Sequence, residues 1–331
     1  MFLIALVLVA LLSFAGVVSA DNYYKGAAPK TNLTGSVTGG VDVQFADTWN
    51  TTPVEDWSKQ QTWANFTINV PSGSTLKFAE FYVVDYCGSM TADYYGNMTV
   101  RLFQGNTEVP YYSPVVVGQP LALKYVNSTG ANYSVVSAPL INLSRTTSDY
   151  VAIFEATGAL SNWGNGNMNV SLTSYNVSGR FDGRFKSAHL IYGWDTPGGS
   201  STEYWINNGN DPITKYIGTY TGNKTVFNIE TLPRTYVANL SVEFVAGNST
   251  SGPGYGKYWF NGRNFTAESG GAGGYPPADW TGTKYAGINN WKWNDESVVT
   301  TNEGDNILEY SRTNDYYKII FGLLTVKDTS E

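Results

Sequence analysis

The chain of 331 residues contains one cysteine, Cys87, and one histidine, His189. A single cysteine excludes an intrachain disulfide, so the fold must be stabilised by its buried core. The same scarcity excludes a structural zinc site built from cysteine and histidine ligands. We interpret Cys87 as a small buried residue at a strand end, with an intermolecular cross-link or reactive thiol as the alternative. His189 lies in an apolar segment and is interpreted as structural rather than catalytic.

Charge is scarce as well. Charged residues make up 14% of the chain, compared with about 25% in an average soluble protein. The formal net charge is −7, and nucleic acid is not expected as a partner because phosphate binding requires basic patches. The acidic balance also argues against binding to an anionic membrane surface.

The sequence lacks the motifs of phosphate-binding loops and of serine hydrolase nucleophile elbows. A glycosidase carboxylate pair has no fixed spacing, because the two groups meet only in space. Candidates in expected strands are Glu80, Glu155, Glu203 and Glu243. The pattern of each strand favours a polar, solvent-facing position over a catalytic one.

Residues 2–18 are the one long apolar run. The residues at positions 18 and 20 fit cleavage by a signal peptidase after Ala20. An uncleaved N-terminal anchor is the alternative, since ~17–25 apolar residues can span a bilayer. We favour a cleaved signal peptide at residues 1–20 and an extracellular or cell-surface protein. Membrane contact is then expected only through this segment, if it is retained.

Asn-x-Ser/Thr sequons are frequent, which on an exported chain is typical of a glycosylated surface protein. The candidate N-glycosylation sites are Asn32, Asn50, Asn65, Asn97, Asn127, Asn132, Asn142, Asn169, Asn176, Asn223, Asn239, Asn248 and Asn264. Chance is the alternative explanation, because asparagine, serine and threonine are all common in this chain.

The hydrophobic pattern predicts β-strands throughout. Phe66, Ile68 and Val70 alternate with polar residues, as in a half-buried strand. One apolar sequence motif occurs three times, as Ala79-x-Phe81-x-Val83, Ala188-x-Leu190-x-Tyr192 and Ala238-x-Leu240-x-Val242. Each copy precedes a glycine-containing loop and an aromatic strand. Many strands without intervening helices predict an all-β fold with two β-sandwich, jelly-roll-like domains.

The domain boundaries are predicted from turn chemistry. Asn207–Pro212 reads Asn-Asn-Gly-Asn-Asp-Pro and is the strongest turn cluster in the middle of the chain. We therefore predict an N-terminal extension at residues 21–31, a first sandwich at residues 32–212 and a second at residues 213–331. Residues 34–45 are expected to form one edge strand.

The chain resembles the archaeal DUF3344 domain family of secreted and cell-surface proteins, which is related to disaggregatase-associated β domains. The resemblance rests on four stretches: Phe66–Val84, Gly179–Gly209, Tyr236–Gly262 and Asp305–Val326. These motifs are structural, so the resemblance implies a β-sandwich and a surface location but no catalytic residues.

Two kinds of binding site are weaker candidates. Calcium prefers carboxylate, amide and backbone oxygens, which gather at Asn207, Asp211, Asp295, Glu296 and Asp305. Ordinary turn chemistry is the alternative explanation of these clusters. Four tryptophans are expected in loops: Trp163, Trp280, Trp291 and Trp293. Stacking on sugar rings is one interpretation of them, and packing in the core is the other.

These observations favour a secreted cell-envelope protein with a structural, adhesive or matrix role and no catalysis. Its expected partners are cell-envelope proteins or surface polysaccharide, and no cofactor is expected apart from calcium. A carbohydrate-binding module and a polysaccharide-degrading enzyme remain as alternatives. Loop tryptophans on one concave face would identify the first, and a cleft with two carboxylates ~5–10 Å apart would identify the second.

Overall fold

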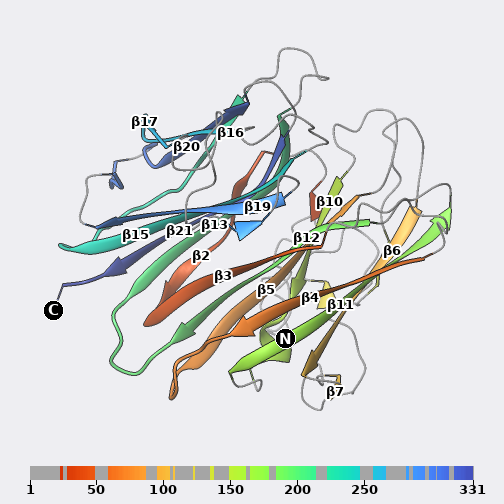
Figure 1. Ribbon diagram of the computed structural model, residues 1–331. Coiled ribbons are helices and arrows are strands. Elements are labelled where there is room, and N and C mark those ends of the chain that lie inside the picture. Colours follow the sequence, from red (N-terminus) through yellow and green to blue (C-terminus); the bar gives the residue numbers. More distant parts are fainter. Residues whose placement is uncertain are drawn as a thin grey trace, which may run out of the picture.

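The computed structural model consists almost entirely of β-strands in four antiparallel sheets (Figure 1). It describes residues 23–24, 28–48, 59–86, 95–104, 107–108, 122–123, 135–137, 149–161, 165–178, 184–213, 222–246, 256–265, 281–282, 286–294, 298–302, 304–312 and 317–330. The predicted all-β sandwich class is confirmed. The predicted signal peptide and Cys87 lie outside the described residues.

The first sandwich is made of sheets 1 and 2. Sheet 1 has the order β4-β11-β6-β7, with β9 also paired to β6. Its strands are β4 (Lys59–Ile68), β6 (Tyr95–Gln104), β7 (Thr107–Glu108), β9 (Val135–Ser137) and β11 (Gly166–Ser178). Sheet 2 has the order β1-β10-β5-β12-β3, with β8 also paired to β10. Its strands are β1 (Tyr23–Tyr24), β3 (Gly39–Asp47), β5 (Thr75–Tyr86), β8 (Ala122–Leu123), β10 (Asp149–Glu155) and β12 (Arg184–Asp195). The short helix α2 (Thr157–Leu160) follows β10.

The second sandwich is made of sheets 3 and 4. Sheet 3 has the order β18-β19-β15-β21-β13-β2. Its strands are β2 (Lys30–Val37), β13 (Thr202–Ile213), β15 (Tyr236–Ala246), β18 (Thr281–Gly282), β19 (Ala286–Asn294) and β21 (Tyr317–Asp328). Sheet 4 has the order β14-β20-β16-β17. Its strands are β14 (Gly222–Val226), β16 (Gly256–Phe260), β17 (Arg263–Asn264) and β20 (Ile307–Arg312).

Each sandwich buries the alternating apolar set that the sequence predicts. Of the alternating and repeated apolar residues, Val70 is partly buried and the following are inside: Phe66, Ile68, Phe81, Val83, Leu190, Leu240 and Val242. Phe227 and Ile229 are buried as well. The repeated motif lies in the central strands of sheets 2 and 3. In sheet 2, Leu190 of β12 lies opposite Phe81 of β5, and in sheet 3, Leu240 of β15 lies opposite Leu324 of β21.

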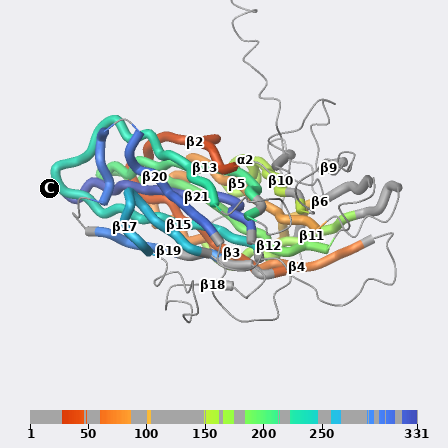
Figure 2. Tube along the Cα trace, turned by 90° about the horizontal axis from the view of Figure 1, so that it is seen from above, coloured from red at the N-terminus to blue at the C-terminus, as the bar shows by residue number. Residues whose placement is uncertain are grey.

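The two sandwiches lie back to back, so that the layers run from sheet 1 to sheet 4 in order (Figures 1 and 2). A third core fills the space between sheets 2 and 3, and includes Tyr82, Val84, Ile206, Phe321 and Leu323. Both faces of β5 are therefore covered, and its residues from 79 to 85 are buried without interruption. Strands covered on both faces give near-continuous apolar runs instead of alternation.

Two expectations from the sequence are wrong. The segment predicted as one edge strand is two strands, because β2 ends at Val37 in sheet 3 and β3 begins at Gly39 in sheet 2. The turn predicted at Asn207–Pro212 lies inside β13, which pairs with β21 through an irregularity between Asn208 and Asp211. The predicted boundary thus falls within a strand of sheet 3. The division of the chain into domains at residue 212 stays a prediction.

Two connections that pass between sheets 2 and 3 lie side by side. One is Thr38, between β2 and β3, and the other is the segment 196–201, between β12 and β13. The Thr38 N–H donates to the Asp195 carboxylate at 2.8 Å, and the Thr196 N–H donates to the Thr38 carbonyl at 3.2 Å. A Cβ at Gly199 would lie 2.0 Å from the Thr38 carbonyl oxygen, so only glycine permits this approach.

We predict that Asp195 makes the stability of this junction depend on pH. Its pKa is lowered from 3.8, first by the Thr38 N–H and then by Lys77. A folded-state pKa below the unfolded value means that the stabilisation is present above the unfolded pKa and is lost as pH falls through the folded one. The stability difference between the wild type and Asp195→Asn should therefore shrink in acid. Denaturant unfolding measured from about pH 6 to about pH 2 tests this, and a constant difference would contradict it.

We also predict that the two sandwiches unfold together. The Phe321 ring lies 4.6 Å from the His189 ring and 6.1 Å from the Tyr82 ring, both in sheet 2. Truncation by Phe321→Ala should cost ~3–5 kcal/mol, because it leaves a cavity in a fully buried site. Calorimetry should show one transition shifted to lower temperature. Two transitions, with only one of them shifted, would mean that the sandwiches are independent.

Candidate functional site

Most of the deeply buried ionisable groups among the described residues gather between sheets 2 and 3. We call them the interface cluster, and it has two parts. The first part comprises Asp149, Lys186, Asn210 and Lys318; the second comprises Glu80, Tyr82, Ser187, His189, Asn208 and Glu243. Every member is 5% exposed or less. Both inner sheets contribute to each part.

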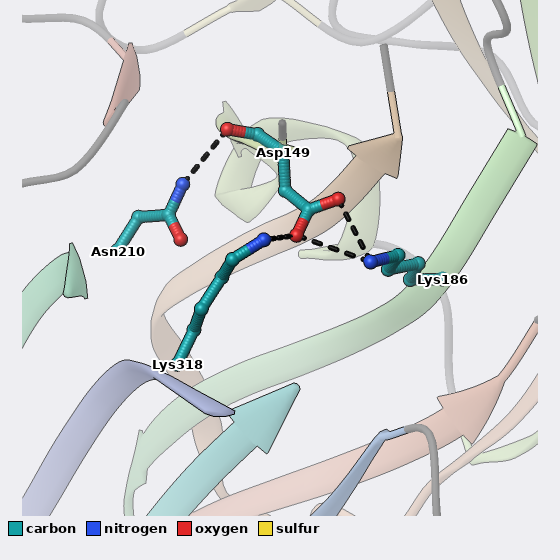
Figure 3. A network of polar contacts seen from close by, with 4 residues as sticks. All are labelled: Asp149, Lys186, Asn210 and Lys318. Carbon is teal, nitrogen blue, oxygen red and sulfur yellow. Dashed lines mark hydrogen bonds and ion pairs between the residues drawn. The ribbon is translucent and has the colours of Figure 1, made fainter. Parts of the chain in front are cut away.

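Asp149 is the centre of the first part (Figure 3). It stands at the start of β10, and its carboxylate contacts Lys318 of β21 and lies 3.0 Å from the Nζ of Lys186 in β12. The Asn210 side chain, from β13, donates to the Asp149 carbonyl at 2.9 Å. Two strands of each inner sheet are thus joined through one aspartate. Lys186 also lies over the Tyr86 ring, with Nζ 4.8 Å from the ring centroid.

His189 and Glu243 form the centre of the second part. The Nδ1 atom of His189 lies 2.6 Å from Oε2 of Glu243, across the space between β12 and β15. This contact has the distance of an ion pair but lies away from the direction of the N–H bond. Ser187 donates to the other oxygen of Glu243 at 2.7 Å. The His189 ring is stacked on Tyr82, with ring centroids 4.4 Å apart.

A hydrogen-bond chain crosses the interface beside this pair. The Asn208 side chain in β13 donates to the Tyr82 hydroxyl at 3.0 Å, and that hydroxyl donates to Glu80. Glu80 and Tyr82 are on the same face of β5 because side chains two residues apart share a face. A polar relay therefore connects sheet 3 to sheet 2 within an apolar surrounding.

The geometry of the cluster suits attachment better than catalysis. Ser187 donates to Glu243 and not to His189, so the three side chains do not form a nucleophile–base relay of the serine hydrolase kind. A general base must reach a substrate proton at hydrogen-bond distance, whereas the His189 and Glu243 side chains have no exposed surface. The arrangement joins the two sandwiches through charged and polar contacts.

The four carboxylates considered from the sequence separate in space. Glu80 and Glu243 were expected on solvent-facing positions, and this is wrong because both are enclosed by the second inner sheet. Glu155 is partly buried and accepts from the Thr157 N–H at 2.8 Å. Glu203 is also partly buried, and its pKa is raised by burial and by repulsion from Glu230. Sequence reasoning missed Asp149, Lys186 and Lys318, whose only local signal is a charge in an apolar strand.

The described calcium candidates already have protein partners. Asn207 donates to Thr225 at 2.7 Å, and Asp211 accepts from Tyr310 at 2.6 Å. Asp305 accepts from Asn302 and Thr300, which lower its pKa. Asp295 and Glu296 lie outside the described residues. The described part of the chain contains no group of three or more metal-ligating side chains, and calcium binding stays a prediction.

The tryptophan candidates also separate. Trp291 and Trp293 were expected in loops, but they lie in β19 and are buried in the core of the second sandwich. Trp163 and Trp280 lie outside the described residues. Sequence reasoning missed Trp63 on β4, which is 51% exposed. Its alternation with Ala64 and Phe66 was a signal for an outward-facing ring.

The sequons fall into four groups. Asn65 and Asn264 are exposed, whereas the four other sites with described side chains are partly buried: Asn32, Asn169, Asn223 and Asn239. Asn97 and Asn176 lie in β6 and β11. The five remaining sites lie outside the described residues: Asn50, Asn127, Asn132, Asn142 and Asn248.

The model of one protein family, described as "Protein of unknown function (DUF3344)", matches residues 23–327. The chain belongs to this family. The resemblance inferred from the strand motifs is confirmed at this level. No curated protein sequence matches the chain. In the described residues, no helix is long and apolar enough to span a membrane.

Several solved structures are only remotely similar to the DUF3344 chain. PNGase F, a glycosylasparaginase from Flavobacterium meningosepticum, is 13% identical with a TM-score of 0.26, covering 88% of this chain and 97% of that one. The ANX2 ectodomain from Arabidopsis thaliana is 8% identical with a TM-score of 0.27, covering 87% and 89%. The mavirus major capsid protein is 10% identical with a TM-score of 0.18, covering 86% and 87%. Such TM-scores are too low to bear on fold or function.

Lys318→Met tests whether the interface cluster holds the sandwiches together. Removing one partner of a buried ion pair costs ~3–5 kcal/mol, because the remaining charge is left uncompensated. Asp149 keeps Lys186 as a partner, so we expect the lower end of that range in denaturant unfolding. The matched control is Lys77→Met, which removes an exposed pair with Asp195 at 3.0 Å and should cost ~0–1 kcal/mol. Equal losses for the two variants would contradict the assignment.

Proposed function

We propose that this DUF3344 chain is a non-catalytic component of the archaeal cell envelope, with a structural, adhesive or matrix role. The observation that carries the proposal is the enclosure of the interface cluster. Among the described residues, His189, Glu80 and Glu243 are suited to acid–base chemistry, and all three are buried between sheets 2 and 3. They take part in the polar contacts between the two sandwiches.

Secretion supports this role, and it rests on the N-terminal residues. The apolar run at residues 2–18 ends in a signal-peptidase pattern before Asp21. The single cysteine means that an extracellular chain of this kind has no intrachain disulfide to stabilise it. A fully enclosed polar interface supplies the cross-connection instead. Envelope proteins or surface polysaccharide are the proposed partners.

A carbohydrate-binding role is the second candidate, and one observation favours it. Trp63 stands exposed on the outer face of sheet 1, and its ring centroid lies 5.4 Å from that of Phe103. Exposed aromatic faces of this kind suit contact with the apolar side of a sugar ring. The raised pKa of Glu203 beside Glu230 is the feature that an enzymatic alternative would use.

Cosedimentation with isolated cell envelopes tests the proposed role. The chain purified from its native source should sediment with the envelopes, and no reducing sugar should be released during incubation. Its N-terminus should be Asp21, because export removes residues 1–20. Glu203→Gln provides the matched control for catalysis.

Three outcomes would count against the proposal. Sugar release that is lost in Glu203→Gln would identify an enzyme in place of a structural protein. An intact Met1 on chain recovered from the cell interior would reject secretion. Failure to sediment with envelopes would reject the adhesive role.

A further inference from the structure

An exposed tryptophan stands on the outer face of sheet 1. Trp63 is the one large apolar side chain among the described residues that is mainly exposed. Its ring contacts Phe103 of β6 at an interplanar angle of 54°. Ser171 of β11 lies opposite Trp63 in the register and is 4% exposed. The indole therefore extends across β11 toward β6, while half of its surface remains open to solvent.

A complete sequon shares the strand face of this tryptophan. Asn65 and Thr67 follow Trp63 at two-residue intervals on β4, and both are exposed. Residues two apart on a strand lie on one face about 7 Å from each other. The Asn65 side chain is exposed, and no hydrogen bond holds it within the described structure. β4 is also the edge strand of sheet 1.

Thr67 is held in position from two sides. Its hydroxyl donates to the Asn167 side chain at 3.0 Å, and its N–H donates to the Gln44 side chain at 2.7 Å. Gln44 also donates to the Thr67 carbonyl. The outward orientation of Trp63, Asn65 and Thr67 is thus fixed by the pairing of β4 and by the contact with β3.

The other sequons with described side chains differ from this one. The Asn223 side chain donates to Asp211 at 2.9 Å, and its oxygen accepts from the Lys224 N–H. Asn32, Asn169 and Asn239 are partly buried. Asn264 is exposed, but Gly262 stands two residues before it. Within this described set, Asn65 alone combines exposure with an aromatic residue at the preceding position on its face.

We propose that Asn65 carries an N-linked glycan whose first sugar stacks on Trp63. The donor class is an oligosaccharide linked to a lipid through phosphate or pyrophosphate. The amide nitrogen of Asn65 bonds to the anomeric carbon as the bond from that carbon to the phosphate oxygen breaks. The nitrogen gives up one proton, and the lipid phosphate leaves with the bonding electrons. The inference rests on the proposed secretion, because N-glycans are added to exported chains.

Physical chemistry favours this occupant for the exposed indole. A sugar ring has an apolar face of C–H groups. The weakly positive hydrogens of that face suit the negative face of an aromatic ring, and the contact also buries apolar surface. The attachment to Asn65 keeps the sugar beside Trp63, so association costs little translational entropy. The neighbouring side chains are amides and hydroxyls, including Asn169 and Ser171, which match sugar hydroxyl groups. The glycan would cover the exposed apolar surface of the first sandwich.

Peptide mass spectrometry on chain from the native source tests occupancy. The peptide that contains Asn65 should carry the glycan mass, and Asn65→Gln should remove it. Glycans at other sequons with an unmodified Asn65 would overturn this inference and leave secretion intact. A chain that starts at Asp21 without any glycan would also overturn it. An intact Met1 without any glycan would reject secretion and this inference together.

A thermodynamic cycle tests the stacking. Trp63→Ala and Asn65→Gln are each compared with the wild type and with the double variant. All four proteins are made in a host that adds N-glycans. The loss from Trp63→Ala should be larger by about 2 °C in melting temperature when the Asn65 glycan is present. Asn264→Gln is the matched control and should show no coupling to Trp63. Additive losses in the Asn65 cycle would overturn the stacking.

Footprinting with hydroxyl radicals gives an independent readout. Trp63 should be oxidised less in the wild type than in Asn65→Gln, because the sugar shields the indole. Chain made in a host without N-glycosylation should fold and show the exposed Trp63 of the structure. Equal oxidation of Trp63 with and without the glycan would overturn the contact. If Trp63 is protected from oxidation only after free polysaccharide is added, its exposed ring binds an external ligand instead of the Asn65 glycan.

Discussion

The structure depends on covering both faces of its two inner sheets. Sheets 2 and 3 each pack on an outer sheet with one face and on each other with the other. The contact of Lys318 with Asp149 lies in that shared interface and joins residues 169 positions apart. Charges enclosed in this way are costly unless they are paired. A polar or charged residue is therefore tolerated on the facing strands of sheets 2 and 3 only where the opposite sheet supplies a partner for it.

Enclosed polar groups restrict how the sandwiches can be arranged. An apolar interface tolerates small shifts, whereas the hydrogen bonds that join Asn208, Tyr82 and Glu80 require one alignment of the two sheets. In some systems, buried polar and ionic groups contribute more to the specificity of the structure than to its net stability. We apply the same explanation to this chain. The apolar residues of the interface hold the sheets together, and the polar residues determine their alignment.

The local pattern of the sequence was sufficient to predict the sandwich class and the inward residues. Phe66, Ile68 and Leu240 are buried because alternation reflects a face that one neighbouring sheet covers. The pattern failed where a partner is distant in sequence. Asn207–Pro212 has turn chemistry, but the Asn207 and Asp211 side chains are satisfied by sheet 4. Glu80 and Glu243 look like solvent-facing residues because the strands that enclose them are distant in sequence.

The position of β2 has a consequence for how the chain acquires its structure. β2 (Lys30–Val37) pairs with β13, and β13 pairs in turn with β21 (Tyr317–Asp328). Sheet 3 cannot be completed until nearly all of these residues are available. Pairings over such separations are formed slowly because loop closure must precede them. A chain with this topology can complete sheet 3 only after its last strand has been synthesised, so folding of this sheet must follow translation of β21.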